Sequence, residues 1–298
     1  MKKIVDGAFL STLETLDLNI KMLMNGQFGG NRRSQAYGSS AEFADYREYM
    51  QGDDLRRIDW NIFARFEKLY IKQYVDERQL HHHVYIDASE SMDHGEPLKS
   101  EAALQIAAAL GFLSVQAMDK VSFFALSEDG CEDICHTIVG KNALYHAVNE
   151  LNELEFYGDT DLCDSIKACE NPGKGNGVSF IISDFLTESD WMSAVDWLLY
   201  HKRQVVLIQV LSPDEITPDI NGKVWFMDSE AFDDEDERNY KTEITRASLK
   251  AYEEAFHYHQ NMIKQFCASR NVDFMTVRSD ESVERIFYFK AMEAEVVK

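Results

Sequence analysis

The chain has 298 residues, of which 45% are hydrophobic, and it carries a formal net charge of −22. This length and composition allow a sizeable core, in one large domain or two small ones, and argue against a disordered protein. The negative charge argues against a nucleic-acid backbone or an anionic lipid surface as a general partner, because both would repel the protein. The segment from Gly30 to Lys72 has eight basic and seven acidic residues, so it is near neutral and leaves room for a local basic surface.

The cysteines and the N-terminus indicate the compartment. Five irregularly spaced cysteines are typical of reduced thiols in a cytosolic protein rather than of a disulfide framework. Asp6, Glu14 and Asp17 interrupt the apolar core that a signal peptide needs. No apolar run reaches the roughly 20 residues of a membrane helix. We therefore expect a soluble, cytoplasmic protein without direct membrane insertion.

The first 80 residues mix helical and extended patterns. Apolar residues at helical spacing predict an amphipathic helix over 9–24. The Gly- and Ser-rich stretch 26–43 predicts an extended or looped segment, followed by a short helix at 60–65 and a strand at 69–75. We expect residues 1–80 to form an N-terminal part that packs on the main domain.

From His82 onward, strands and helices alternate. Short, nearly continuous apolar runs are typical of parallel strands buried on both faces, and alternation with helices predicts a doubly wound, mostly parallel α/β sheet over residues 81–298. A hairpin at 131–138 and an insertion at 212–243 interrupt the pattern. The predicted strands are 84–86, 121–126, 178–182, 205–211 and 272–277, and the predicted helices are 99–118, 188–202, 247–271 and one that begins at 281.

Oxygen-bearing side chains gather where the predicted strands end. Asp87, Ser89 and Ser91 directly follow the first buried strand, Asp184 ends another, and Thr160 precedes a helix. Because ligands bind at the carboxyl ends of the strands in such a sheet, we expect these five side chains to meet at one edge. Each motif alone also suits a turn or a helix cap, and capping is compatible with metal ligation.

Two carboxylates and three hydroxyls are a ligand set for a hard divalent cation. Mg²⁺ prefers near-octahedral oxygen coordination, retains water and takes only one or two protein carboxylates. The carboxylates balance its charge, while the neutral hydroxyls orient the ion and leave a position open. The sequence therefore predicts a Mg²⁺ site, and ligand type alone does not distinguish Mg²⁺ from Mn²⁺.

The same five residues resemble the metal-ion-dependent adhesion site of von Willebrand factor A (vWA) domains. Asp87, Ser89 and Ser91 match its first motif, and Thr160 and Asp184 match the second and third. The resemblance implies a vWA-like, Rossmann-like sheet whose metal is completed by an acidic residue of a partner protein. Asp159 and Phe185 stand where many relatives have Gly, so we expect them to shape the rim that meets the partner.

The segment from Arg32 to Asp129, which includes "YREYMQGDDLRRIDWNIFARFEKLYIKQYVDE", resembles the bacterial family called domain of unknown function fifty-eight, and "VWFMDSE" at 224–230 is a weaker match. Members of that family join this segment to a vWA domain and are often encoded beside MoxR-type AAA+ ATPases. The resemblance implies a role with such an ATPase in assembling or activating other proteins. Within the segment, Arg56 and Arg57 either pair internally with Asp59 or face a partner.

A non-enzymatic protein-binding module is the first hypothesis. A Mg²⁺-dependent phosphoesterase-like hydrolase is an alternative, with His94 as the nearby candidate base. A scaffold with a vestigial metal site is another. Cys131, Cys135 and His136 suggest a zinc site but lack a second ligand pair at suitable spacing.

Overall fold

The structure is a computed structural model, and it divides the chain into two units, residues 24–79 and residues 1–23 with 80–298. Most of the predicted helix at 9–24 and of the predicted loop at 26–43 lies outside the described residues. The described residues are 4, 5, 9, 13, 42–75, 79–169, 177–187, 189–218, 222–226 and 240–287.

In its described part, residues 42–75, the smaller unit contains a two-stranded antiparallel pair, a 3-10 turn (Leu55–Arg57) and one short α-helix. Strand β1 (Glu42–Glu48) pairs with β2 (Tyr70–Val75), and helix α2 (Trp60–Phe66) lies between them in the chain. The Asp59 side chain begins α2 by accepting hydrogen bonds from the Asn61 and Ile62 amides. These bounds confirm the short helix and the strand predicted from the sequence.

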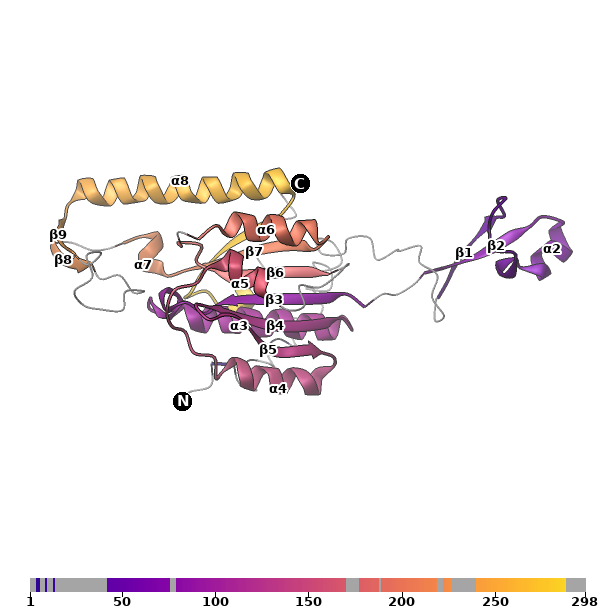
Figure 1. The fold of residues 1–298 in the computed structure, drawn as a ribbon, viewed down its shortest axis with the longest axis horizontal. Coiled ribbons are helices and arrows are strands. Elements are labelled where there is room, and N and C mark those ends of the chain that lie inside the picture. The colour runs from indigo at the N-terminus through magenta and orange to yellow at the C-terminus, as the bar shows by residue number, and fades with distance from the viewer. Residues whose placement is uncertain are drawn as a thin grey trace. The chain divides into compact units, whose positions relative to one another are not determined.

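The larger unit contains a six-stranded sheet with the order β10-β7-β6-β3-β4-β5 (Figure 1). Numbered along the chain, these strands run 3-2-1-4-5-6 across the sheet, which is the order of Rossmann-type doubly wound folds. All neighbours are parallel except β4 and β5, so the predicted mostly parallel α/β fold is confirmed. The strands are β3 (His81–Asp87), β4 (Lys120–Ser127), β5 (Gly130–Ile138), β6 (Val178–Ser183), β7 (Gln204–Leu211) and β10 (Asp273–Arg278).

The hairpin predicted within 131–138 is instead a hairpin between β4 and β5. Gly130 has a φ of 104°, a conformation that glycine adopts without strain, and it turns the chain directly after β4. The run 131–138 therefore continues as one antiparallel edge strand.

Helices cover both faces of the sheet (Figure 1). One face carries α3 and α4, and α3 approaches β4 so closely that a Cβ added at Gly111 would lie 2.5 Å from the Phe123 ring. The other face carries α5, α6 and α8. These helices are α3 (Lys99–Gln116), α4 (Lys141–Leu151), α5 (Leu162–Ala168), α6 (Trp191–Tyr200) and α8 (Arg246–Arg270).

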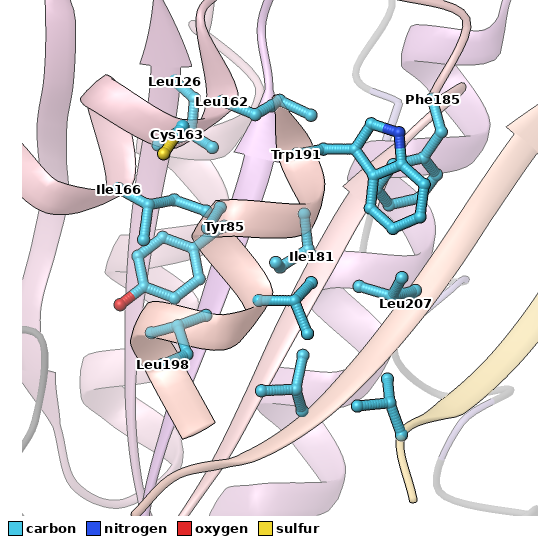
Figure 2. Close-up of a cluster of buried hydrophobic side chains, with 14 of the residues drawn as sticks. Tyr85, Leu126, Leu162, Cys163, Ile166, Ile181, Phe185, Trp191, Leu198 and Leu207 are labelled. Carbon is cyan, nitrogen blue, oxygen red and sulfur yellow. The ribbon is translucent and has the colours of Figure 1, made fainter. Parts of the chain in front are cut away.

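A cluster of buried apolar side chains holds the second face together (Figure 2). Tyr85, Ile181 and Leu207 contribute from the sheet, and Trp191 of α6 packs on them. Removal of such surface from water contributes about 25 cal/mol per Å² of apolar area. Phe185 belongs to the same cluster, with its ring centroid 5.6 Å from that of Trp191. The core therefore anchors the residue that directly follows Asp184.

The predicted insertion begins with a one-turn helix, α7 (Pro213–Ile216), and holds a two-stranded antiparallel pair, β8 (Gly222–Phe226) and β9 (Tyr240–Ile244). The last elements of the described residues are β10 and the short helix α9 (Val283–Arg285). Within the described part of the chain, no helix is both long enough and apolar enough to pass through a bilayer.

The cysteines differ from the sequence-based expectation. Cys131 and Cys169 form a disulfide with a Cα–Cα distance of 5.4 Å, so the prediction that all five cysteines are reduced thiols is wrong. The pair joins the start of β5 to the end of α5. Two cysteines 38 residues apart carry no local signal of pairing, because their proximity depends on the fold. Cys135, Cys163 and Cys267 are free thiols.

Candidate metal centre

The candidate site lies where the order of the sheet reverses. After β3 the chain adds β4 and β5 on one side and then returns to place β6 on the other side. Doubly wound folds in general bind ligands at such a point, outside the carboxyl ends of the two central strands. Asp87 is the last residue of β3, and Asp184 directly follows β6.

Asp87 is a buried carboxylate with both oxygens occupied. Its Oδ1 accepts the Ser89 amide at 3.1 Å, and its Oδ2 accepts the Ser183 hydroxyl at 2.6 Å. Burial raises the pKa of Asp87 to about 6, and the nearby Asp184 carboxylate contributes to the rise. A cation at this position would therefore stabilise the ionised form of the site.

Ser91 links the loop after β3 to the loop after β6. Ser89 Oγ lies 3.1 Å from Ser91 Oγ, and Ser91 donates to Asp184 Oδ2 at 3.2 Å. The other Asp184 oxygen accepts the Leu186 amide at 3.0 Å. Four of the five predicted ligands, Asp87, Ser89, Ser91 and Asp184, thus lie together in one largely buried cluster.

Thr160 reaches the same edge by a different route. The loop that carries it bonds to the Asp87 loop through its backbone: the Glu90 amide donates to Gly158 O, and the Tyr157 amide donates to Ala88 O, both at 2.9 Å. The buried Thr160 hydroxyl itself donates to Leu126 O at 3.3 Å. Its oxygen retains lone pairs, but none of the described hydrogen bonds joins it to the other four ligands.

The helix-cap interpretation of these motifs does not hold. Ser89 precedes a short 3-10 helix but makes no side-chain capping bond to it. Asp161, rather than Thr160, caps α5, and Asp190, rather than Asp184, caps α6. The oxygens of the predicted ligands are therefore not used as caps for these helices.

A buried lysine completes the cluster. Lys99 Nζ donates to Asp184 Oδ2 at 2.7 Å and to Glu215 Oε1 at 2.6 Å. Burial by itself would lower the pKa of Lys99, but the two carboxylates outweigh it and the net shift is upward. The site thus contains three carboxylates, those of Asp87, Asp184 and Glu215, and one ammonium.

The residues present fit a hard cation. Adjacent ligands of an octahedral Mg²⁺, with bonds of about 2.1 Å, lie about 3.0 Å apart. The Ser89–Ser91 and Ser91–Asp184 oxygen distances, 3.1 and 3.2 Å, match such edges. Among the described residues no group of three or more His, Cys, Asp or Glu side chains could hold a metal. A cation here would use the hydroxyls together with the carboxylates, and hydroxyl oxygens suit Mg²⁺ or Mn²⁺ better than zinc.

The sequence comparisons identify the family. The family model described as "Protein of unknown function DUF58" matches residues 45–262, well over half of the chain. The chain belongs to the DUF58 family. Relatives include the uncharacterized proteins Rv1480 of Mycobacterium tuberculosis and Mb1516 of Mycobacterium bovis. Each is 28% identical over 235 residues, which cover 76% of this chain and 72% of the relative.

Solved structures that resemble this DUF58 protein include the SpRpn10 VWA domain, with a TM-score of 0.39 and 8% identity, covering 70% of this chain and 94% of that one. Proximal thread matrix protein 1 from the mussel byssus matches with a TM-score of 0.35 and 12% identity, covering 44% and 35% of the two chains. The strand order and the family together agree with the vWA-like architecture expected from the sequence.

The residues predicted to meet a partner occupy different environments in this DUF58 protein. Asp159 is exposed beside the site, as a rim residue must be. Phe185 is fully buried, so it supports the Asp184 loop from the core instead of lining the rim. Arg56 is exposed in the smaller unit, and the Arg57 side chain lies outside the described residues. The Asp59 carboxylate forms its described ion pair with Lys72, at 3.0 Å, and not with Arg56 or Arg57.

Several residues that shape the site gave no sequence signal. Lys99 reads only as the start of an apolar helix, and Ser183 as the end of a strand. Gln209 donates to Asp184 O at 2.8 Å, and Gln260 of α8 donates to Gln209 Oε1 at 2.6 Å. His259, also of α8, donates to Phe185 O at 2.9 Å. The α8 helix thus holds the backbone on which Asp184 stands.

Proposed function

We propose that this DUF58 protein is a non-enzymatic, metal-dependent protein-binding module. Asp87, Ser89, Ser91, Thr160 and Asp184 hold Mg²⁺, for which Mn²⁺ can substitute, and a partner's Asp or Glu carboxylate fills the remaining coordination position. The observation that carries the proposal is the cluster in which Ser91 joins the Asp87–Ser89 loop to Asp184 at the topological switch point.

The chemistry of this capture is electrostatic. Asp87 and Asp184 supply negative charge, while the serine hydroxyls orient the ion without neutralising it fully. Asp87 and Asp184 are buried, so the effective dielectric at the site is lower than that of bulk water. The attraction between a carboxylate and a cation is therefore stronger at the site than in water. The bound ion then favours an acidic partner residue over a neutral one. Asp159, exposed beside the site, would contact the partner's surface around that residue.

The resemblance to the DUF58 family supports a MoxR-type AAA+ ATPase as the partner. In this proposal the two proteins act together in the assembly or activation of other proteins. Arg56, exposed on the smaller unit, offers a second, basic contact for an acidic partner.

Metal titration of the Asp87→Ala variant tests the site itself. We expect Mg²⁺ or Mn²⁺ to raise the thermal midpoint of the wild-type protein, because a ligand at 100 times its Kd adds about 2.7 kcal/mol to the stability of the folded state. Asp87→Ala should abolish this response. Glu90→Gln removes one negative charge from the same turn, where Glu90 is exposed, and should retain the response.

Affinity capture tests the partner. The wild-type protein should retain an AAA+ ATPase in Mg²⁺ and release it in EDTA, and Asp87→Ala should fail to retain it in either buffer. Capture that survives both Asp87→Ala and EDTA would contradict metal-dependent binding. A midpoint that is the same in Mg²⁺ and EDTA would favour a scaffold whose metal site is vestigial.

A hydrolase finds less support in the geometry. It needs a general base beside the ion, and His94, the candidate from the sequence, is exposed with its Nδ1 donating to Glu90 O at 2.8 Å. Loss of phosphoester turnover in Asp184→Ala would favour this alternative.

The cytoplasmic location stays a prediction, and the Cys131–Cys169 disulfide argues against it, because structural disulfides are typical of oxidising compartments.

A further inference from the structure

Lys99 lies at an unfavourable place for a cation. It is the first residue of α3, an 18-residue helix, and it is almost fully buried. The partial positive charge at a helix N-terminus repels a cation, and burial removes the water that would solvate the ammonium. The described contacts that offset these costs are the bonds to Asp184 and Glu215, at 2.7 and 2.6 Å.

The position of the ammonium bears directly on the proposed metal site. Asp184 Oδ2 accepts both Lys99 and Ser91, so its lone pairs are already engaged. A divalent ion that uses this carboxylate would lie within a few ångströms of a fixed positive charge. Two cations so close in a buried site repel each other strongly.

Glu215 offers the ammonium a second carboxylate. It belongs to α7, and its Oε2 accepts the Ser212 amide at 2.7 Å, so its orientation is fixed by the capping box of that helix. Glu215 is also the more exposed of the two carboxylates, with a side chain 25% accessible against 4% for Asp184. Lys99 can therefore keep one partner when the other binds a metal.

We infer that Lys99 is a built-in counter-cation that competes with the divalent metal for Asp184, with Glu215 as the residue that draws the ammonium away. This inference rests on the proposed metal site and adds that Lys99 and Glu215 set the affinity of that site for the metal. When no metal is bound, the ammonium balances the buried carboxylates. When metal binds, the lysine–Asp184 bond is lost and the lysine–Glu215 bond remains. The cost of that exchange weakens metal binding.

The test is calorimetric titration of wild-type and variant proteins with Mn²⁺ and with Mg²⁺. Lys99→Met removes the competing charge and should tighten metal binding by about tenfold. Glu215→Gln leaves the ammonium with Asp184 alone and should weaken binding by about threefold or more. Lys264→Met, which removes an exposed charge from α8, is the matched control and should leave the affinity unchanged.

Thermal stability provides a second readout. Without metal, Lys99→Met should melt below the wild-type protein, because the buried Asp184 and the partly buried Glu215 lose their counter-ion. Saturating Mn²⁺ should then raise the midpoint of Lys99→Met by more than it raises that of the wild type. If Lys99→Met does not fold, the Glu215→Gln titration decides alone, and affinity that is unchanged or tighter would overturn the inference.

The possible failures are distinguishable. If the wild type binds Mn²⁺ and Asp87→Ala does not, the metal site stands. Unchanged or weaker binding by Lys99→Met would then overturn only the role of the lysine. If none of the proteins binds Mn²⁺ or Mg²⁺, including Lys99→Met, both the metal site and the competition fail.

Discussion

The two ends of the central sheet both bury polar side chains, but they balance them differently. At the amino end, the Arg203 guanidinium donates to His81 O at 2.7 Å, to Val178 O at 3.0 Å and to Ser179 Oγ at 3.0 Å. At the carboxyl end, Asp87 and Asp184 lie close together with one lysine. Neutral acceptors satisfy the arginine, whereas the carboxylates keep an excess of negative charge. A buried charge alone therefore does not mark a ligand site, because the buried guanidinium is satisfied by neutral acceptors, whereas two like charges held close together, as at the carboxyl end, indicate a candidate site.

The amino-end histidines support this distinction. His82 Nδ1 accepts the Val178 amide at 3.3 Å, and its Nε2 faces Asp119 Oδ2 at the same distance. His81 Nε2 lies 2.8 Å from Ser122 Oγ. Each ring thus has a structural partner within the sheet and its adjoining loops. This end holds strands together, and we assign it no ligand.

The largest expected loss of stability comes from a substitution at the amino end of the sheet. Arg203→Leu removes three hydrogen bonds and leaves buried acceptors unpaired, so it should lower the free energy of unfolding by about 3–5 kcal/mol. Urea unfolding monitored by circular dichroism measures the change. Lys202→Gln, at the exposed neighbouring position, should stay within about 0.5 kcal/mol of the wild type. A loss of less than about 1 kcal/mol in Arg203→Leu would show that the amino end is not structural.

A smaller effect is expected from acid. Burial lowers the pKa of His83 to about 2, and the positive charge of Arg203 contributes to the shift. The unfolded chain, with a histidine pKa near 6.5, therefore binds one more proton than the folded chain below that pH. The stability contributed by neutral His83 is complete above pH 6.5 and should fall by about 1–2 kcal/mol between pH 6.5 and pH 5.

His83→Phe tests the assignment of this acid sensitivity. The ring would remain beside Tyr85 and Phe124, whose ring centroids lie 6.0 and 5.2 Å from that of His83, but it could not take up a proton. Unfolding midpoints at pH 6.5 and pH 5 should differ less in His83→Phe than in the wild type. His146→Phe, at an exposed position of α4, should retain the wild-type difference. Equal acid sensitivity in His83→Phe and the wild type would assign the effect to other groups.

The smallest stability effect is expected at the carboxyl end. Asp87→Asn weakens the bonds from Ser89 and Ser183 but also removes one of two neighbouring negative charges. The opposing terms should leave the metal-free stability within about 1 kcal/mol of the wild type. The same variant should lose the thermal response to Mg²⁺. A loss of unfolding free energy as large as that of Arg203→Leu would mean that Asp87, like Arg203, has a structural role.

Periodicity predicted the parts of this structure that depend on local sequence. The apolar runs around Ile86 and Ile182 gave the central strands, and hence the strand-end positions of Asp87 and Asp184. The orientation of Thr160 depends on backbone hydrogen bonds between its loop and the loop after Asp87. Such bonds leave no pattern of apolar and polar residues in the sequence. Lys99 and the Cys131–Cys169 disulfide depend on contacts between residues far apart in the chain, so the sequence alone did not reveal them.

The hydrogen bonds from α8 to the 184–185 backbone have a mechanical consequence. Gln260 reaches Asp184 O through Gln209, and His259 bonds Phe185 O directly. From Gln260 to the start of the helix at Arg246, α8 rises about 21 Å, so a tilt of about 5° at Gln260 moves the far end by about 2 Å. That far end adjoins β9 of the insertion. A shift of the 184–185 backbone on ligand capture would thus tilt α8, and the N-terminal end of this helix, next to the insertion hairpin, would move farther than the backbone itself.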